Sequence, residues 1–273
     1  MPGKDERAGH ALRDSLGGRV RYLRKRWRWL RTNVAGALRA RRELHPVAAP
    51  VADLNRYERR VRSQNGEDGI LDALFTILGT TNRTFVEFGA GRGYRSTAAH
   101  LLLDRGWTGL MMDGSKTSRS HPDLRQEFVT AENIEALLAK HAVPHELDLL
   151  VIDIDGNDYW VWKAITRHRA RVVVVEYNPS VPPGEARVLP YDPAFVWDRT
   201  DYYGASLLAL ARLGAERGYR LVACDNSGTN AFFVDAALAE GRLVRRSVEE
   251  LYRPASREGG RGHAPSGRQL MPI

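Results

Sequence analysis

Short apolar runs alternate along the chain with longer segments in which apolar residues recur every three or four positions. The first pattern is typical of buried β-strands and the second of amphipathic helices. Strands are predicted at residues 84–87, 107–113, 128–130, 147–154, 171–176, 219–224 and 231–234. Helices are predicted at residues 63–78, 95–104, 133–140, 158–165 and 206–216.

The regular alternation of these elements predicts the fold class. It indicates an α/β, Rossmann-like, doubly wound and mostly parallel sheet of about seven strands with helices on both faces. Only a short turn containing Asn226, Ser227 and Gly228 separates the last two strands. Such a link is too short for a parallel crossover, so the last strand is expected to run antiparallel.

Two appendages flank the predicted sheet domain, residues 51–253. In the N-terminal arm, residues 1–50, apolar residues including Leu23, Trp27 and Leu30 recur at helical spacing among many arginines, before Pro46 and Pro50 mark a linker. Such a basic amphipathic helix either contacts an anionic membrane surface through residues 19–42 or packs its apolar stripe on the core or on a second subunit. Residues 254–273 are rich in Gly, Arg, Ser and Pro, which predicts a disordered tail.

The charge of the chain is unevenly distributed. The formal net charge is +8, but residues 1–62 hold 17 Lys and Arg against 6 Asp and Glu, whereas residues 63–253 hold 21 against 26. A mildly acidic domain argues against nucleic acid as a partner. The charge says nothing of other partners, and the oligomeric state stays open.

The compartment expected from the sequence is the cytoplasm, with peripheral contact to the inner face of the membrane as the alternative for the arm. No apolar run reaches the roughly 18–20 residues of a membrane span, and the N-terminus lacks the apolar core of a signal peptide. Cys224 is the single cysteine, so no disulfide within the chain and no cysteine-rich zinc site can form.

A glycine-rich turn follows the first predicted strand, which ends at Glu87. Gly89, Gly91 and Gly93 let the backbone approach a ligand closely, in a spacing that differs from the dinucleotide fingerprint. The second strand ends in Asp113, where a carboxylate can accept hydrogen bonds from both ribose hydroxyls. The order of these features favours a nucleoside site, and the alternative is that Asp113 only caps a turn.

Carboxylates gather after the fourth and fifth strands. Asp153, Asp155 and Asp158 fall within six residues, and Glu176 ends the next strand. Carboxylates that lie close together repel, which raises a pKa or recruits a cation. One of them can act as a general base on a hydroxyl, or Asp153 with Asp155 or Asp158 can bind Mg²⁺. The alternative for Asp158 is a helix cap.

With these motifs, the chain resembles class I S-adenosylmethionine-dependent methyltransferases, and in particular the FkbM-like group. The likeness covers residues 63–235. It rests on the glycine turn, on residues 153–158 (Asp-Ile-Asp-Gly-Asn-Asp), and on the segments around Glu176, Tyr219 and Asn230. The group typically has glutamate where this chain has Asp155 and Asp158, so each carboxylate here is one methylene shorter.

The resemblance implies a cofactor, an activity and a set of site residues. It implies S-adenosylmethionine as the cofactor, a small-molecule or glycan acceptor as the partner, and O-methylation of a sugar, polysaccharide or secondary-metabolite hydroxyl as the activity. Residues Gln64, Glu67, Glu87, Gly89, Gly91, Gly93 and Asp113 would bind the cofactor. Residues Asp153, Asp155 and Glu176 would be catalytic, and Asn178 would face the acceptor. A nucleoside-binding scaffold without activity and a carboxylate-dependent metal hydrolase are the rival hypotheses.

Overall fold

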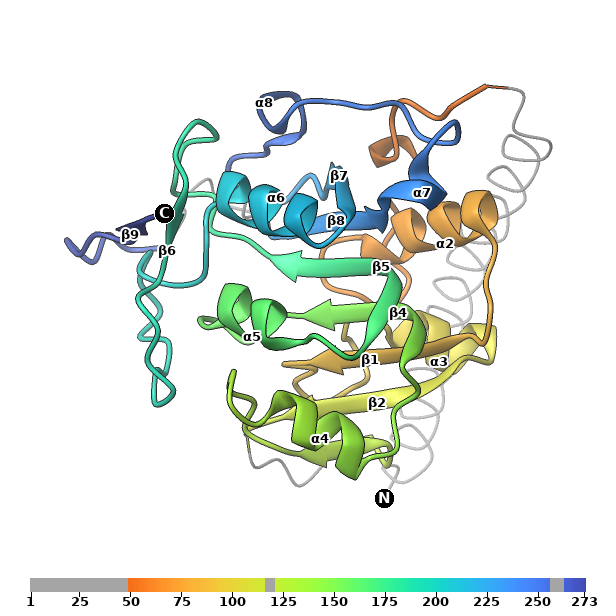
Figure 1. Ribbon diagram of the computed structural model, residues 1–273, viewed down its shortest axis with the longest axis horizontal. Helices are drawn as coiled ribbons and strands as arrows, with labels where there is room; N and C mark the ends of the chain where they lie inside the picture. The colour runs from red at the N-terminus through yellow and green to blue at the C-terminus, as the bar shows by residue number, and fades with distance from the viewer. Residues whose placement is uncertain (1–48, 116–120, 256–262) are drawn as a thin grey trace, which may run out of the picture. The chain divides into compact units, whose positions relative to one another are not determined.

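The computed structural model describes residues 49–115, 121–255 and 263–273. Its main sheet has seven strands in the order β3-β2-β1-β4-β5-β8-β7 (Figure 1). The first five strands of this order, from β3 to β5, run parallel to one another. Strand β8 runs antiparallel to both β5 and β7. The predicted fold class, a mostly parallel Rossmann-like sheet with an antiparallel last strand, is therefore confirmed.

The elements of the described residues follow one another in the predicted alternation. The strands are β1 (Thr84–Phe88), β2 (Thr108–Asp113), β3 (Leu124–Gln126), β4 (Glu146–Ile152), β5 (Arg169–Glu176), β6 (Arg187–Val188), β7 (Tyr219–Cys224), β8 (Asn230–Asp235) and β9 (Met271–Pro272). The helices are η1 (Asn55–Tyr57), α2 (Glu67–Leu78), α3 (Ala99–Arg105), α4 (Ile134–Lys140), α5 (Asp158–Ala164), α6 (Leu207–Glu216), α7 (Ala236–Ala239) and α8 (Val248–Leu251).

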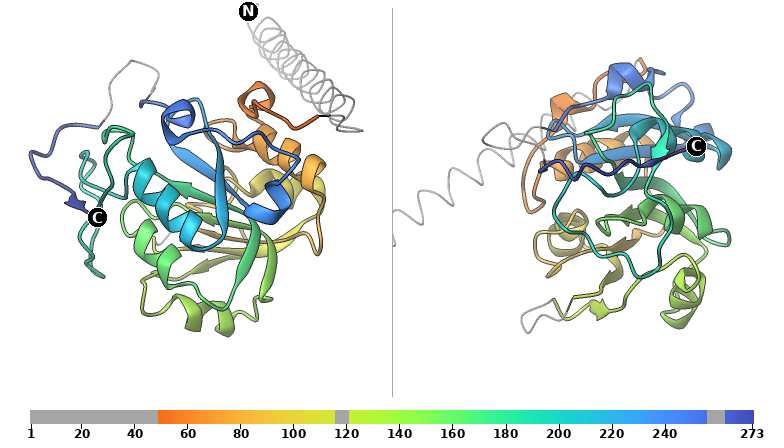
Figure 2. Two further views of the ribbon diagram at one scale, coloured as in Figure 1. Left: turned by 45° about the horizontal axis from the view of Figure 1, so that its top comes forward. Right: turned by 90° about the vertical axis from the view of Figure 1, so that its left-hand side faces the viewer.

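Helices cover both faces of the sheet. Helices α4, α5 and α6 lie on one face, and α2 and α3 lie on the other (Figure 2, right). Alternate residues of each central strand serve the two faces, so that Phe88, Ile152 and Val175 belong to the core beneath α4 to α6. Burial on both faces explains why the central strands are continuous apolar runs and not alternating ones.

The strand order reverses between β1 and β4. The chain proceeds outward from β1 to β2 and β3, then returns to place β4 on the other side of β1. In open α/β sheets, the crevice outside the carboxyl ends of the strands at such a switch point is the usual place for a ligand. The turn after β1 and the loop that starts at Asp153 meet there.

Two sequence-based predictions are corrected by the structure. The third strand is Leu124–Gln126 and not residues 128–130, because Thr130 and Asn133 exchange hydrogen bonds that begin α4 instead. The tail is not disordered throughout, because Met271–Pro272 pairs with Arg187–Val188. Leu270 is buried against Val181 and Leu189, so one apolar anchor outweighs the polar composition of residues 263–273. Residues 1–48 of the predicted N-terminal arm lie outside the described residues, so the helix expected there stays a prediction.

Candidate functional site

The turn after β1 contains the three glycines identified in the sequence. Gly89, Gly91 and Gly93 have φ angles of 74°, 57° and 77°, a region that L side chains rarely adopt. At Gly89 the requirement is also steric, because a Cβ atom there would lie 1.5 Å from the carbonyl oxygen of Asp153. The glycine turn, residues 89–93, is therefore pressed against the loop after β4, at the switch point of the sheet.

Glu87 connects this turn to the helix that follows it. Its buried carboxylate accepts hydrogen bonds from the amides of Thr97 and Ala98, at 2.8 and 3.1 Å. Burial raises the pKa of Glu87 to about 7. Hydrogen bonds from Ser96 and from the two amides lower this pKa by less than burial raises it. The carboxylate thus connects the end of β1 to the start of α3 across the glycine turn.

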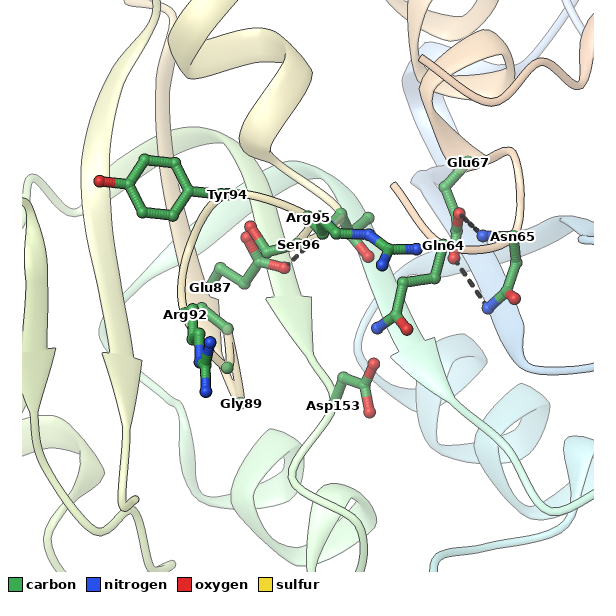
Figure 3. A pocket seen from close by; sticks show the side chains of 13 residues that line it. Gln64, Asn65, Glu67, Glu87, Gly89, Arg92, Tyr94, Arg95, Ser96 and Asp153 are labelled. Atoms are coloured by element: carbon green, nitrogen blue, oxygen red, sulfur yellow. Dashed lines mark hydrogen bonds between the residues drawn. The ribbon is translucent and has the colours of Figure 1, made fainter. Parts of the chain in front are cut away.

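The opposite wall is formed by the segment before α2. One oxygen of the buried Asp68 accepts the amides of residues 61–63 at 2.7–2.9 Å. Glu67 accepts the amide of Asn65 at 2.9 Å. These contacts fold the segment back over the start of α2 and bring Gln64 to face the glycine turn (Figure 3).

A cavity of about 290 Å³ lies between these walls, near the lower end of the roughly 300–1,000 Å³ of small-molecule pockets. Of the residues predicted to bind a cofactor, five line it: Gln64, Glu67, Glu87, Gly89 and Gly91. Asp153 also lines it, and its carboxylate lies beneath Gln64 in Figure 3. The structure therefore brings together residues that are 89 positions apart in sequence, from Gln64 to Asp153.

Gly93 and Asp113 lie outside the lining of the cavity. Oδ2 of Asp113 accepts the amide of Gly91 at 2.7 Å, and Oδ1 accepts the amide of Ser115 at 2.8 Å. Oδ2 retains a second lone pair for another donor. Asp113 thus supports the glycine turn, and it stays a candidate for ribose binding at the edge of the cavity.

A group of three carboxylates adjoins the cavity. Oxygen atoms of Asp153, Asp155 and Glu176 lie within 4.8 Å of one another. Asp155 is exposed and has a φ of 57°, a strained conformation of the kind that gathers at functional sites. Burial, together with the negative charges of Asp155 and Asp158, raises the pKa of Asp153 well above the usual carboxyl range. The donor set suits a hard cation, and the raised pKa suits a base.

The predicted metal role of Asp158 is wrong. Its side chain is fully buried, and its two oxygens accept the amides of Ile154 and Gly156, at 2.8 and 2.9 Å. Both oxygens therefore hold the loop between β4 and α5, although Asp158 is not the helix cap of the alternative hypothesis, because the N-cap of α5 is Asn157. The carboxylate that joins Asp153 and Asp155 is Glu176, delivered by the neighbouring strand.

The predicted acceptor contact of Asn178 is also wrong. The residue is fully buried, and its side-chain amide donates to the carbonyl oxygens of Asp201 and Tyr203, at 2.8 and 2.9 Å. Its carbonyl oxygen accepts the amide of Ser180 at 2.9 Å. Asn178 therefore holds the segment after β5 in place.

Several residues of the site were missed by sequence reasoning. Arg92 and Arg95 line the cavity. Their positions in and just after the glycine turn could have identified them as candidates for ligand binding. Asn230 donates to Glu67 at 2.9 Å across 163 residues. No local pattern could reveal that contact, because it depends on the insertion of β8 between β5 and β7.

The buried carboxylates predict how stability depends on pH. Burial raises the pKa values of Glu87, Asp158 and Asp225 to about 7, from ordinary values of 4.5, 3.8 and 3.8. A carboxyl whose pKa is higher in the folded chain stabilises the fold below its unfolded pKa, and this contribution is lost as pH rises through the folded value. Urea titrations should therefore give a free energy of unfolding at least about 2 kcal/mol higher at about pH 5 than at about pH 8.

Glu87→Gln is the matched control for this expectation. The variant keeps the shape of the side chain but cannot titrate, so its stability should change less between the two pH values. Stability that rises from about pH 5 to about pH 8 would show that these groups are ionised at ordinary carboxyl pKa values in the folded protein.

The fold and the site together define a Rossmann-like α/β protein with a small-molecule cavity at its switch point. No protein-family model matches the chain, and a comparison with curated proteins finds no similar sequence. Among the helices of the described residues, none is long and apolar enough to cross a membrane.

Proposed function

We propose that this protein is an S-adenosylmethionine-dependent methyltransferase that methylates a hydroxyl group of a sugar, polysaccharide or secondary metabolite. The observation that carries the proposal is the cavity between the glycine turn and α2, which is lined by Glu67, Glu87 and Asp153. Its position at the carboxyl ends of β1 and β4 supports a nucleoside-type ligand.

The charges in the cavity favour a ligand with positive groups. The carboxylates of Glu67, Glu87 and Asp153 repel one another, and this repulsion contributes to the raised pKa values of Glu87 and Asp153. A cationic ligand stabilises their ionised forms. S-adenosylmethionine carries a sulfonium and an ammonium group, so the carboxylates of the cavity fit its positive charges. When bound, it supplies a methyl group on a positively charged sulfur.

Asp153 is positioned to serve both the cofactor and the acceptor. It lines the cavity, and it also belongs to the group of three carboxylates with Asp155 and Glu176. In the proposed reaction Asp153 would accept the proton of the acceptor hydroxyl, whose oxygen becomes methylated while the sulfonium sulfur leaves as a neutral thioether. Orientation and deprotonation are the contributions of the protein to such a transfer.

The same three carboxylates fit Mg²⁺ by the chemistry of their donors. Asp153, Asp155 and Glu176 would hold the ion, since hard cations prefer carboxylate oxygens. An ion there would lower the pKa of an acceptor hydroxyl.

The proposed compartment is the cytoplasm, in keeping with a single buried cysteine, Cys224, that has no disulfide.

Titration calorimetry with S-adenosylhomocysteine tests the proposal directly. Micromolar binding is expected for the intact chain, whereas a metal hydrolase would not bind this ligand. We expect Asp113→Ala to weaken the binding by about tenfold, because it removes a charged hydrogen-bond acceptor at the edge of the cavity and the support of Gly91.

Asp123→Ala is the matched control, because Asp123 is an exposed carboxylate of the same region that does not line the cavity. Equal affinity of the intact chain and Asp113→Ala would remove Asp113 from the site. Methyl transfer to a glycan or metabolite extract, followed by mass spectrometry, then separates an enzyme from a scaffold that only binds the nucleoside.

A further inference from the structure

Two arginines stand out against the acidic lining of the cavity. Arg92 and Arg95 both line it and are both exposed. Neither side chain forms an ion pair or a hydrogen bond to another side chain among residues 49–115, 121–255 and 263–273. Other arginines of the same region are paired, such as Arg62 with Asp104 at 2.6 Å. The two lining arginines are therefore available to a ligand.

The two arginines point in different directions. Arg95 extends from the segment after the glycine turn into the cavity, in the direction of Gln64 (Figure 3). Arg92 lies beside Gly89 and points away from Gln64 in the same view. Only Arg95 thus directs its guanidinium group to the part of the cavity that Gln64 and Asp153 line.

The cavity therefore has several negative groups in its lining and one positive group directed into it. Asp153 and Glu67 lie on the side of β4 and α2, and Arg95 reaches in from the side of α3. Opposite charges in the lining of one cavity suit a ligand that carries an ammonium and a carboxylate on the same carbon atom. An α-amino acid group has this arrangement.

We infer that Arg95 binds the carboxylate of an α-amino acid group in the ligand, whose ammonium group faces Asp153, so that Arg95 selects ligands that retain the amino-acid part. The inference rests on the proposed function and adds a specificity-determining residue to it. A guanidinium group is suited to this role because its planar N–H donors match a carboxylate in a bidentate fashion.

A phosphate is the other anion that an arginine commonly binds. The three carboxylates of the lining disfavour it, since a dianionic phosphate beside Glu67, Glu87 and Asp153 would add to their repulsion. A carboxylate brings one negative charge and, in an α-amino acid, a compensating positive charge. The charge balance of the cavity therefore favours the amino-acid group.

Calorimetry with three ligands and three variants tests this inference. The ligands are S-adenosylhomocysteine, methylthioadenosine, which lacks the amino-acid part, and adenosine monophosphate, which carries a phosphate. For Arg95→Gln we expect about tenfold weaker binding of S-adenosylhomocysteine and unchanged binding of methylthioadenosine. Arg95→Lys should recover part of the loss, because it keeps the charge without the bidentate geometry. Arg92→Gln is the matched control and should change either affinity less than threefold.

The outcomes separate this inference from the proposed function. If the intact protein binds neither adenosyl ligand, the proposed function fails and the inference fails with it. If both bind and Arg95→Gln weakens both equally or neither, the inference alone is overturned. Tighter binding of adenosine monophosphate than of S-adenosylhomocysteine, lost in Arg95→Gln, would assign Arg95 to a phosphate instead. Thermal melting should show an unchanged fold, because Arg95 is exposed and has no side-chain partner in the described part of the chain.

Discussion

Asp153→Asn is expected to lower the rate of methyl transfer by about 10²–10⁴-fold, the range that a positioned general base contributes. The substitution keeps the size of the side chain but removes its ability to accept a proton. Asp153 is the residue for this test because it alone belongs both to the lining of the cavity and to the group of three carboxylates. The measurement is turnover with a saturating acceptor, once an acceptor has been found.

The pH dependence of the rate gives a second readout of the same base. A base acts only when it is ionised, so the rate should fall as pH falls through its pKa. Burial and the neighbouring carboxylates raise the pKa of Asp153 well above the usual carboxyl range. The loss of kcat/KM for the cofactor, which reports the free enzyme, should therefore begin at a higher pH than for an ordinary aspartate.

Asp158→Asn provides a structural comparison, since Asp158 binds two backbone amides and does not line the cavity at the glycine turn. It should lower stability, with a smaller effect on the rate of the folded protein. Full turnover after EDTA would remove Mg²⁺ from the proposal and leave the base in place. Full turnover by Asp153→Asn would contradict the assignment of the base.

Gly89→Ala should destabilise the protein by about 3 kcal/mol or more and abolish binding of S-adenosylhomocysteine. The added Cβ would lie 1.5 Å from the carbonyl oxygen of Asp153. No change of rotamer can relieve this contact, because the backbone of residue 89 fixes the position of Cβ and the carbonyl oxygen belongs to the backbone of Asp153. The turn would have to move away from the loop after β4, which would open the switch point. Urea titration gives the stability, and calorimetry gives the binding.

Gly91→Ala is a close control, two residues away in the same turn. Gly91 also has a positive φ, of 57°, but a Cβ atom there would have no neighbour within 4 Å. Its cost should therefore be only the backbone strain, about 1–2 kcal/mol. Equal destabilisation by the two substitutions would show that strain, and not the contact between the two loops, determines the need for glycine at position 89.

The sequence alone determined the fold class and much of the candidate site. The predicted strand at residues 219–224 was confirmed with its boundaries, and the predicted antiparallel last strand was confirmed as well. Apolar runs identify central strands because such strands are buried on both faces. The glycine turn and Glu87 could be found because they are contiguous in the chain, directly at the end of β1.

Only the tertiary structure decided which carboxylates act together. Asp153, Asp155 and Asp158 lie within six residues of one another, but the turn after β4 directs Asp158 to the backbone amides of that turn. Glu176 of β5 is instead the third member of the group. The pairing of Asn230 with Glu67 likewise depends on the placement of β8 beside β5. Side-chain direction after a strand depends on the path of the loop, and residue spacing does not encode that path. The same holds for the segment 263–273, whose polar composition concealed the burial of Leu270.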